Sequence, residues 1–231
     1  MIDILIPVYN KSFLTIQCLQ DYSCLDKANH KITIFNNGSK DNTLEKVNEF
    51  IRTNTNVGMI DSKENLGFAR SCNEMFKNTK EEIVIFSNND IRCIKSGIND
   101  WTNTIVETLE DDMLLSPTAG LIDNKFNFVY ETQDKNKPWN YLSGWLLCGK
   151  RKTFEKFIDY GEHPFTQDMT TYFEDTWLSF RAKQIGIKMQ LVKVPIIHLG
   201  KQTSKDMNVG QMYTKARSIF INKCKKEGIV L

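Results

Sequence analysis

Hydrophobic residues in the first half of the chain form short continuous runs rather than an alternating pattern. Residues 4–6, 32–35, 57–60 and 83–86 each predict a buried strand, the first ended by Pro7 and the second by Asn36. Strands that are apolar on both faces are typical of a parallel sheet lying between two layers of helices.

Segments with helical spacing separate these runs. We predict a helix from Ser12 to about Tyr22, and a second helix that Asn42 caps with Glu45 three residues further on. A loop that starts at Asn65 enters a third helix. The apolar face of the second helix would consist of Leu44, Val47 and Ile51. This alternation of strands and helices predicts an α/β fold.

The second half of the chain has a more mixed pattern. Residues 113–116 and 128–130 predict further strands, and residues 173–185 a helix that ends at Gly186. Another helical face is formed by Ile98, Trp101, Ile105 and Leu109, and a half-buried strand by Ile187, Met189 and Leu191. Residues 206–231 are basic and predict a final helix. Since no repeat or linker is visible, we expect a single domain over residues 1–231.

The composition is that of a folded globular protein. Of the 231 residues, 41% are hydrophobic and 25% charged, and 30 basic residues nearly balance 28 acidic ones, so the net charge does not select a polyanionic partner. The six cysteines form no CxxC pair, which indicates reduced thiols. No secretory signal or membrane-spanning run is visible. We therefore expect a cytoplasmic protein, with peripheral attachment at the inner membrane face as an open alternative.

Polar residues follow the predicted strands at the same edge of the sheet. Clusters around Tyr9, at Asn36 and Asn37, and at Asn88 to Asp90 come directly after three of the four buried runs. In open α/β sheets, ligands bind beyond the carboxyl ends of the strands. The spacing therefore predicts a binding cleft there, although each cluster is also ordinary turn chemistry.

Two of the candidate motifs suit the binding of phosphate and a metal ion. Gly67 allows close backbone approach, and the helix after it offers free N–H groups to an anion, with Arg70 as a charged donor. Asp90, flanked by the amides of Asn88 and Asn89, suits Mg²⁺ or Mn²⁺. A capped helix with a surface arginine, and a simple turn, are the structural alternatives.

Two further motifs suit proton transfer and ligation. Glu174 and Asp175 lie near a helix N-terminus, which stabilises the charged form that a general base requires. His198 follows an apolar strand and precedes Gly200, where it could ligate a metal or contact phosphate. Helix-end electrostatics and a structural histidine explain the same residues without a function.

The order of these motifs resembles the family 2 glycosyltransferases over residues 4 to about 204. The matching segments are Ile6-Pro7-Val8-Tyr9-Asn10, Asn37-Gly38-Ser39-Lys40-Asp41, Asn65-Leu66-Gly67-Phe68-Ala69, Tyr141-Leu142-Ser143-Gly144, Phe173-Glu174-Asp175 and Ile197-His198-Leu199-Gly200. The resemblance implies a GT-A fold, a Rossmann-like and mostly parallel sheet flanked by helices with a smaller mixed sheet on the acceptor side. It also implies an inverting transfer from a nucleotide-diphosphate sugar of the UDP or dTDP type.

The resemblance also assigns roles to single residues. Asp175 would be the catalytic base. Asp90, at the DxD position formed by residues 88–90, would bind Mn²⁺ or Mg²⁺, and His198 would complete the metal or diphosphate site. Residues 1–95 would bind the donor and residues 96–205 the acceptor, with Trp145 and Glu174 on the acceptor side. The donor contacts would come from Pro7, Val8, Tyr9, Asn36, Asn65, Gly67, Arg70, Asn88 and Asn89. Asn36 and Asn88 replace acids that the family usually has. The first change leaves the nucleobase of the sugar nucleotide open, and the second leaves open whether a metal ion is required.

The acceptor is not determined by these motifs. A surface glycan or its lipid-linked precursor is the expectation from the family, and a hydroxylated DNA base is an alternative that the basic final helix would fit. A nucleotidyltransferase and a non-catalytic module that binds sugar nucleotides are the remaining alternatives, and the oligomeric state stays open. Aromatic candidates for sugar stacking are Trp139, Tyr141, Trp145, Tyr172 and Trp177.

Overall fold

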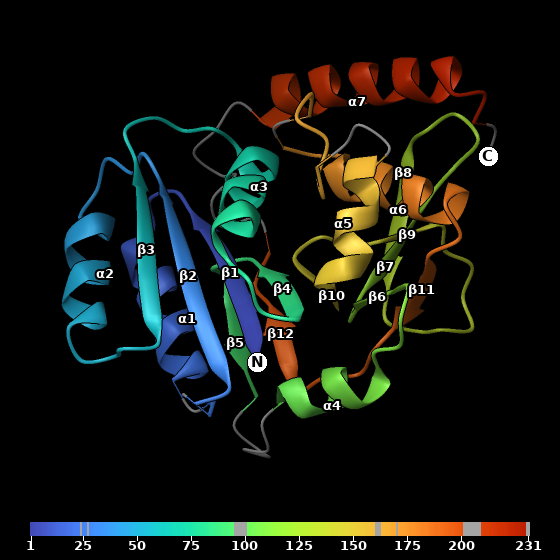
Figure 1. Ribbon diagram of the computed structural model, residues 1–231. Helices are drawn as coiled ribbons and strands as arrows, with labels where there is room; N and C mark the ends of the chain where they lie inside the picture. The colour runs from blue at the N-terminus through green and yellow to red at the C-terminus, as the bar shows by residue number, and fades with distance from the viewer. Residues whose placement is uncertain are drawn as a thin grey trace.

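The computed structural model describes residues 1–23, 25–26, 28–94, 101–159, 163–169, 171–200 and 209–229. A seven-stranded sheet with the order β11-β6-β10-β4-β1-β2-β3 runs through its centre (Figure 1). Its strands are β1 (Ile2–Val8), β2 (His30–Asn37), β3 (Val57–Ser62), β4 (Ile83–Ser87), β6 (Met113–Ser116), β10 (Leu146–Lys150) and β11 (Lys188–Leu191). All neighbouring pairs are parallel except those of β10, which confirms the predicted α/β fold with a mostly parallel sheet.

Helices cover both faces of this sheet. The helices are α1 (Ser12–Tyr22), α2 (Thr43–Ile51), α3 (Phe68–Asn78), α4 (Trp101–Thr108), α5 (Arg151–Asp159), α6 (Glu174–Gln184) and α7 (Val209–Lys226). Side chains of α1, α2 and α4 share one buried core with Ile4 and Ile6 of β1, whereas α3, α5 and α6 share another with Leu5. Since successive residues of a strand point to opposite faces, β1 lies between two helical layers.

Two smaller antiparallel sheets complete the fold. β8 (Phe128–Thr132), β7 (Ala119–Ile122) and β9 (Tyr141–Leu142) form one, and β5 (Ile91–Cys93) pairs with β12 (Ile196–His198) in the other. The β5–β12 pair joins segments about a hundred residues apart, and it brings His198 opposite Ile91, the residue after Asp90.

The predicted strand ends at Pro7 and Asn36 were too early. β1 continues through Pro7 to Val8, and β2 continues to Asn37. β1 pairs with β4 only as far as Leu5, so on that side no partner strand faces Pro7, whose nitrogen carries no hydrogen. Both strands therefore reach one or two residues further toward the cleft than their apolar runs suggest.

Helix α2 departs from its predicted capping and face. Asn42 occupies the N-cap position, but its side chain makes no capping bond, and Asp41 accepts the N–H of Thr43 instead (3.0 Å). Leu44, predicted on the buried face, is exposed, whereas Val47 is buried. Ile98, predicted on the face that becomes α4, lies outside the described residues.

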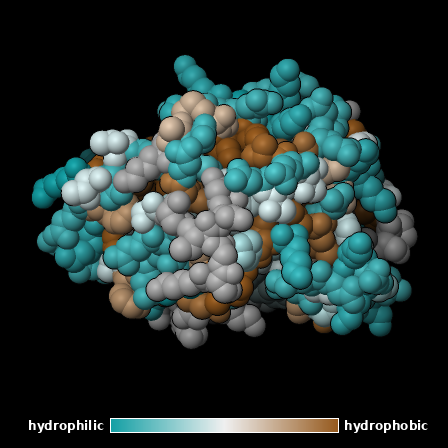
Figure 2. Space-filling view, turned by 90° about the horizontal axis from the view of Figure 1, so that it is seen from below, coloured by the Kyte–Doolittle hydropathy of each residue, from teal (hydrophilic) through white to brown (hydrophobic). Residues whose placement is uncertain are grey.

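The final helix is basic, as predicted, and begins at Val209. It lies across the upper edge of the molecule in Figure 1 and packs Ala216, Phe220 and Cys224 against Phe173 and Trp177. In the described part of the chain, no helix contains an apolar stretch long enough to cross a bilayer. The face on the α4 side is mainly hydrophilic, with separate hydrophobic areas (Figure 2).

Candidate active site

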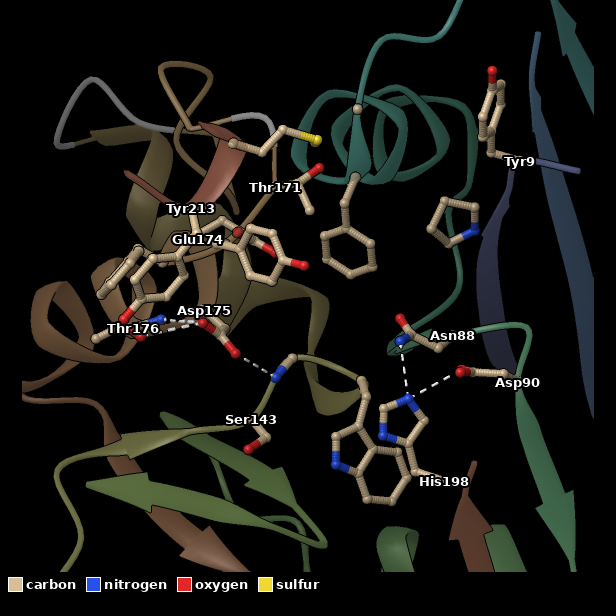
Figure 3. Close-up of a pocket in the computed structure, with 18 of the residues that line it drawn as sticks. Tyr9, Asn88, Asp90, Ser143, Thr171, Glu174, Asp175, Thr176, His198 and Tyr213 are labelled. Atoms are coloured by element: carbon tan, nitrogen blue, oxygen red, sulfur yellow. Dashed lines mark hydrogen bonds and ion pairs between the residues drawn. The ribbon is translucent and has the colours of Figure 1, made fainter. Parts of the chain in front are cut away.

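A cavity of about 750 Å³ opens at the carboxyl ends of β1 and β4 (Figure 3). This volume is within the range of ordinary small-molecule sites. On the side that the sequence predicts to bind the sugar donor, called the donor side, the lining comes from the ends of β1 and β2, the start of α3 and the segment after β4. On the opposite side it comes from the β7–β8–β9 sheet, the start of α6 and α7. Its predicted lining residues are Pro7, Val8, Tyr9, Asn65, Gly67, Asn88, Asn89, Asp90, Trp145, Glu174, Asp175 and His198.

Asn37 organises the loop before α3. Its Oδ1 accepts the N–H of Leu66 (2.7 Å), and its Nδ2 donates to the carbonyl of Gly67 (3.3 Å). The Asn65 side chain accepts the N–H of Gly67 (2.9 Å), and Gly67 has φ +83° and ψ 171°, which glycine alone adopts readily. These bonds direct the N-terminus of α3 toward the cavity, as the motif predicted.

Two predicted donor contacts lie elsewhere. Asn36 is buried, does not line the cavity and donates to Asp61 Oδ1 (2.6 Å). Since neighbouring strand residues point in opposite directions, Asn37 faces the cavity in its place. Arg70 is exposed, does not line the cavity and donates to the carbonyl of Gln167 (3.4 Å). Contact of Asn36 or Arg70 with the sugar donor remains a prediction.

Asn88, Asp90 and His198 meet on the donor side of the cavity. His198 Nε2 lies 3.0 Å from Asp90 Oδ1 and 3.3 Å from Asn88 Nδ2. Asp90 is 5% exposed, and its Oδ1 lacks a hydrogen bond of good geometry despite that short ion-pair distance. The ring of Trp145 stacks on His198, with centroids 4.9 Å apart and planes at 12°. Trp145 therefore supports His198, whereas the sequence placed it on the acceptor side.

This arrangement fits one divalent cation. Adjacent ligands at ~2.1 Å in octahedral geometry are about 3 Å apart, which matches the separation of His198 Nε2 and Asp90 Oδ1. Asp90 Oδ1 is a buried oxygen that still lacks a well-aligned donor. No cluster of three His, Cys, Asp or Glu side chains that could hold a metal occurs among the described residues. Donor phosphates and water would therefore complete the coordination, as is usual for Mg²⁺.

Asp175 lies across the cavity from this group (Figure 3). Its Oδ2 accepts the N–H of Gly144 (2.9 Å) and its Oδ1 accepts the N–H of Thr176 (2.7 Å). A Cβ on Gly144 would stand 3.0 Å from the Asp175 Cβ, tighter than most such contacts, so a larger residue here would have to push Asp175 away. Two backbone donors on different elements therefore fix the orientation of the carboxylate.

The two carboxyl groups at the start of α6 have unusual acidities. Removal from solvent raises the pKa of Asp175 to about 6, and the nearby Glu131 raises it as well, against the two backbone hydrogen bonds that lower it. Burial and the charge of Asp175 raise the pKa of Glu174 further above its usual value. Perturbed acids in a cavity are typical of functional sites.

Sequence reasoning missed much of the acceptor side. Tyr141 and Tyr172, predicted as candidates for sugar stacking, line the cavity. The lining also includes Asn37 and Phe68 on the donor side, and Ile122, Phe128, Glu131, Ser143, Gly144, Thr171, Phe173, Thr176, Met212 and Tyr213 on the acceptor side. Glu131 on β8 accepts a hydrogen bond from the hydroxyl of Ser143. The Tyr141–Gly144 segment and the aromatic candidate Tyr172 were signals for part of this set. Glu131, Met212 and Tyr213 gave no local signal, because packing alone brings their elements to the cavity.

The backbone just before Asp175 is strained. Tyr172 and Phe173 have φ of +72° and +64°, a region that large side chains rarely adopt. The Phe173 ring stacks on Phe220 of α7 (5.0 Å between centroids), and Tyr172 packs edge-on against Tyr213 (5.8 Å). These contacts hold the strained link in place and connect α7 to the position of Asp175.

Comparison with known proteins agrees with this geometry. The family described as "Glycosyl transferase family 2" matches residues 3–172. The mannosyltransferase PcManGT from Pyrobaculum calidifontis, solved with GDP-Man and Mn²⁺, is similar in structure at 14% identity and a TM-score of 0.64, over 88% of this chain and 59% of that one. S. aureus TarS with UDP-GlcNAc has 17% identity and a TM-score of 0.61, over 89% and 61% of the two chains.

A third similar structure is GalNAc-T7 with UDP, GalNAc and Mn²⁺, at 14% identity and a TM-score of 0.69, over 86% of this chain and 43% of that one. At these identities the likeness shows the fold alone, a GT-A arrangement as expected. The chain spans about 60% of the length of the first of these structures. No curated protein sequence matched this chain.

Proposed function

Because the chain belongs to glycosyl transferase family 2, we propose that it transfers a sugar from a nucleoside-diphosphate donor to an acceptor hydroxyl with inversion. The observation that carries this proposal is the pairing of two groups across one cavity. Asp175, a carboxylate held by two backbone donors, faces Asp90 and His198 over space for a sugar. A metal-assisted leaving group and a base on opposite sides are what an inverting displacement requires.

The donor nucleoside lies against the end of β1 in this proposal. Pro7, Val8 and Tyr9 offer an apolar wall with a polar edge, and Asn37 and Asn65 position the loop beside them. The N–H groups at the start of α3 would face the donor phosphates, since helix N-termini favour anions. The similar structures solved with UDP-GlcNAc and GDP-Man support a sugar nucleotide as donor, and we propose a UDP- or dTDP-sugar.

Asp175 carries the proton transfer. Its carboxylate accepts the proton of the acceptor hydroxyl while that oxygen attacks the anomeric carbon. The new carbon–oxygen bond forms on the face opposite the diphosphate as the bond to the diphosphate oxygen breaks. Gly144 and Thr176 keep Asp175 aligned for this step through their N–H groups.

Asp90 and His198 would hold the Mn²⁺ or Mg²⁺ of this reaction, with Asn88 beside them. When bound, the cation neutralises the charge that develops on the departing diphosphate. Trp145 stacks on the His198 ring in a nearly parallel plane and so restricts the direction of Nε2. We propose a surface glycan as the product class and a cytoplasmic site of action.

The test is a donor screen with the purified chain. We expect UDP or dTDP sugars with Mn²⁺ to raise the melting temperature, since a ligand at ~100 times its Kd adds about 2.7 kcal/mol. The same donors should be slowly hydrolysed without acceptor. Asp90→Ala should lose the Mn²⁺-dependent part of the stabilisation. An absence of stabilisation and of hydrolysis with every nucleoside-diphosphate sugar would contradict the proposed function.

A further inference from the structure

The acceptor side of the cavity is lined by carboxyl groups. Glu131, Glu174 and Asp175 line it, and no lysine or arginine occurs among the described lining residues of the whole cavity. His198, the one other group there that can carry a positive charge, lies across the opening beside Asp90 (Figure 3). Among the described lining residues, an acceptor that approaches Asp175 therefore meets acidic side chains and neither lysine nor arginine.

Glu174 carries a buried oxygen that lacks a partner. The residue lines the cavity and is 8% exposed, and its Oε2 is a buried atom without a hydrogen-bond partner. Leaving a buried acceptor unsatisfied is costly, so a ligand that supplies a hydroxyl at this point gains a hydrogen bond that the free protein lacks. This unpaired oxygen is independent of the observation that the lining is acidic, and it points to a ligand with many hydrogen-bond donors.

Glu131 is positioned next to the proposed base. The hydroxyl of Ser143 donates to Glu131, and the N–H of the next residue, Gly144, donates to Asp175. Adjacent residues of one segment therefore anchor the two carboxylates, which places both on the same side of the cavity, where one sugar unit could contact both. Ser143 is itself fixed, since its carbonyl accepts the hydroxyl of buried Ser116 (2.9 Å).

The surroundings of these acids also suit a sugar. Phe128 and Tyr213 line the same side, and Tyr172 packs edge-on against Tyr213. Aromatic faces pack well on the apolar faces of sugar rings, and carboxylates accept hydrogen bonds from the hydroxyls at their edges. A phosphate in this position would instead face Glu131 and Asp175 without a cationic partner among the described lining residues.

We propose, building on glycosyl transfer as the function, that the acceptor is a neutral sugar unit and that Glu131 selects it. Glu131 binds hydroxyls adjacent to the one that faces Asp175, and Glu174 accepts a further one. Acceptors with a phosphate next to the reacting hydroxyl, including nucleic acid, are rejected by the same carboxylates.

The experiment compares neutral glycosides with their phosphorylated counterparts. Full-length protein, a donor found by thermal shift and Mn²⁺ are assayed with methyl glycosides, neutral oligosaccharides, the matching sugar phosphates and a hydroxymethylated oligonucleotide. We expect transfer to a neutral glycoside at least tenfold faster than to its phosphate. Glu131→Gln should raise the acceptor KM at least tenfold, with the donor Kd changed by less than a factor of two. Glu131→Lys should shift the preference toward the phosphorylated acceptor by at least tenfold.

The matched control is Glu155→Gln, the same change at an exposed carboxylate on α5 that does not line the cavity. Its acceptor KM should equal that of the unchanged protein. Preference of the unchanged protein for sugar phosphates or the oligonucleotide would overturn the inference. So would donor hydrolysis without transfer to any neutral glycoside, or an unchanged acceptor KM in Glu131→Gln. Failure of the proposed function is distinct, because it abolishes donor binding and hydrolysis before any acceptor is added.

Discussion

The donor side and the acceptor side of the cavity are built in different ways. Apart from His198 and the Trp145 that stacks on it, the donor side consists of residues at the ends of β1, β2 and β4 and at the start of α3, so three neighbouring strands of one parallel sheet deliver most of it. The acceptor side collects residues from the β7–β8–β9 sheet, α6 and α7, which are distant in sequence. The first depends on sheet geometry, and the second depends on the packing of separate elements.

This difference predicts which substitutions affect donor binding and which affect acceptor binding and catalysis. Changes on the acceptor side should alter catalysis and acceptor binding while the donor remains bound. Changes on the donor side should remove both, because the donor supplies the leaving group. Variants on the two sides should therefore distinguish donor binding from catalysis.

Asp175→Asn should separate catalysis from donor binding most clearly. Removal of the base should lower kcat about 10³-fold, because general-base catalysis contributes roughly 10² to 10⁴. The donor Kd, measured by calorimetry with Mn²⁺ present, should change by less than a factor of two. Asp168→Asn is the matched control, because Asp168 is paired with Lys223 and does not line the cavity. A kcat within threefold of the unchanged protein would remove Asp175 from the role of base.

Gly144→Ala should weaken catalysis through geometry alone. The added methyl group would stand 3.0 Å from the Asp175 Cβ and displace the carboxylate from its Gly144 N–H. A small misplacement of a reacting group costs roughly 10- to 100-fold, so we expect a fall in kcat of this size. Steady-state kinetics at saturating acceptor measures it, with far-UV circular dichroism to check folding.

Gly58→Ala provides the comparison for that variant. Gly58 lies on β3, and a Cβ there meets no atom within 4 Å. Its kinetics should match those of the unchanged protein. Equal kinetics in Gly144→Ala would show that the close approach to Asp175 has no part in catalysis.

The smallest predicted effect is on the pH profile. With its pKa raised to about 6, Asp175 is charged above that pH and protonated below it, so kcat should fall about tenfold from pH 7 to pH 5. Glu131 is one cause of the raised pKa, so Glu131→Gln should move this fall to lower pH. A flat kcat between pH 7 and pH 5 would contradict the assignment.

The first half of the fold was predictable because its signals are local. Continuous apolar runs identified β1 to β4, and helical spacing identified α1 to α3. The insertion of β10 between β4 and β6 was not predictable, because residues 139–148 are mostly apolar and aromatic, and the place of a strand in the sheet depends on contacts distant in sequence. β5 and β12 are only three residues each, and their pairing depends on contacts across about a hundred residues.

The site residues also divide into those with a local sequence signal and those placed by long-range packing. Asp90, His198 and Asp175 were identified by the motifs that contain them, and all three line one cavity. Asn36 was assigned to the donor by the family resemblance and by its place directly after the apolar run. β2 continues to Asn37, and the alternation of side chains along the strand directs Asn37, not Asn36, to the cavity. Glu131 could not be found from sequence, since its place depends on an edge strand that only tertiary packing aligns with Ser143.

The strained Tyr172–Phe173 link has a consequence for how the molecule matures during synthesis. The strands that shape the nucleotide pocket leave the ribosome first, and they can pair while the rest of the chain is still being made. The aromatic rings of Tyr213 and Phe220, which secure the strained link, emerge about forty residues after Asp175. A nascent chain would therefore bind its sugar nucleotide before it can transfer the sugar. Transfer would begin only when α7, the last described helix, packs against the Tyr172–Phe173 link.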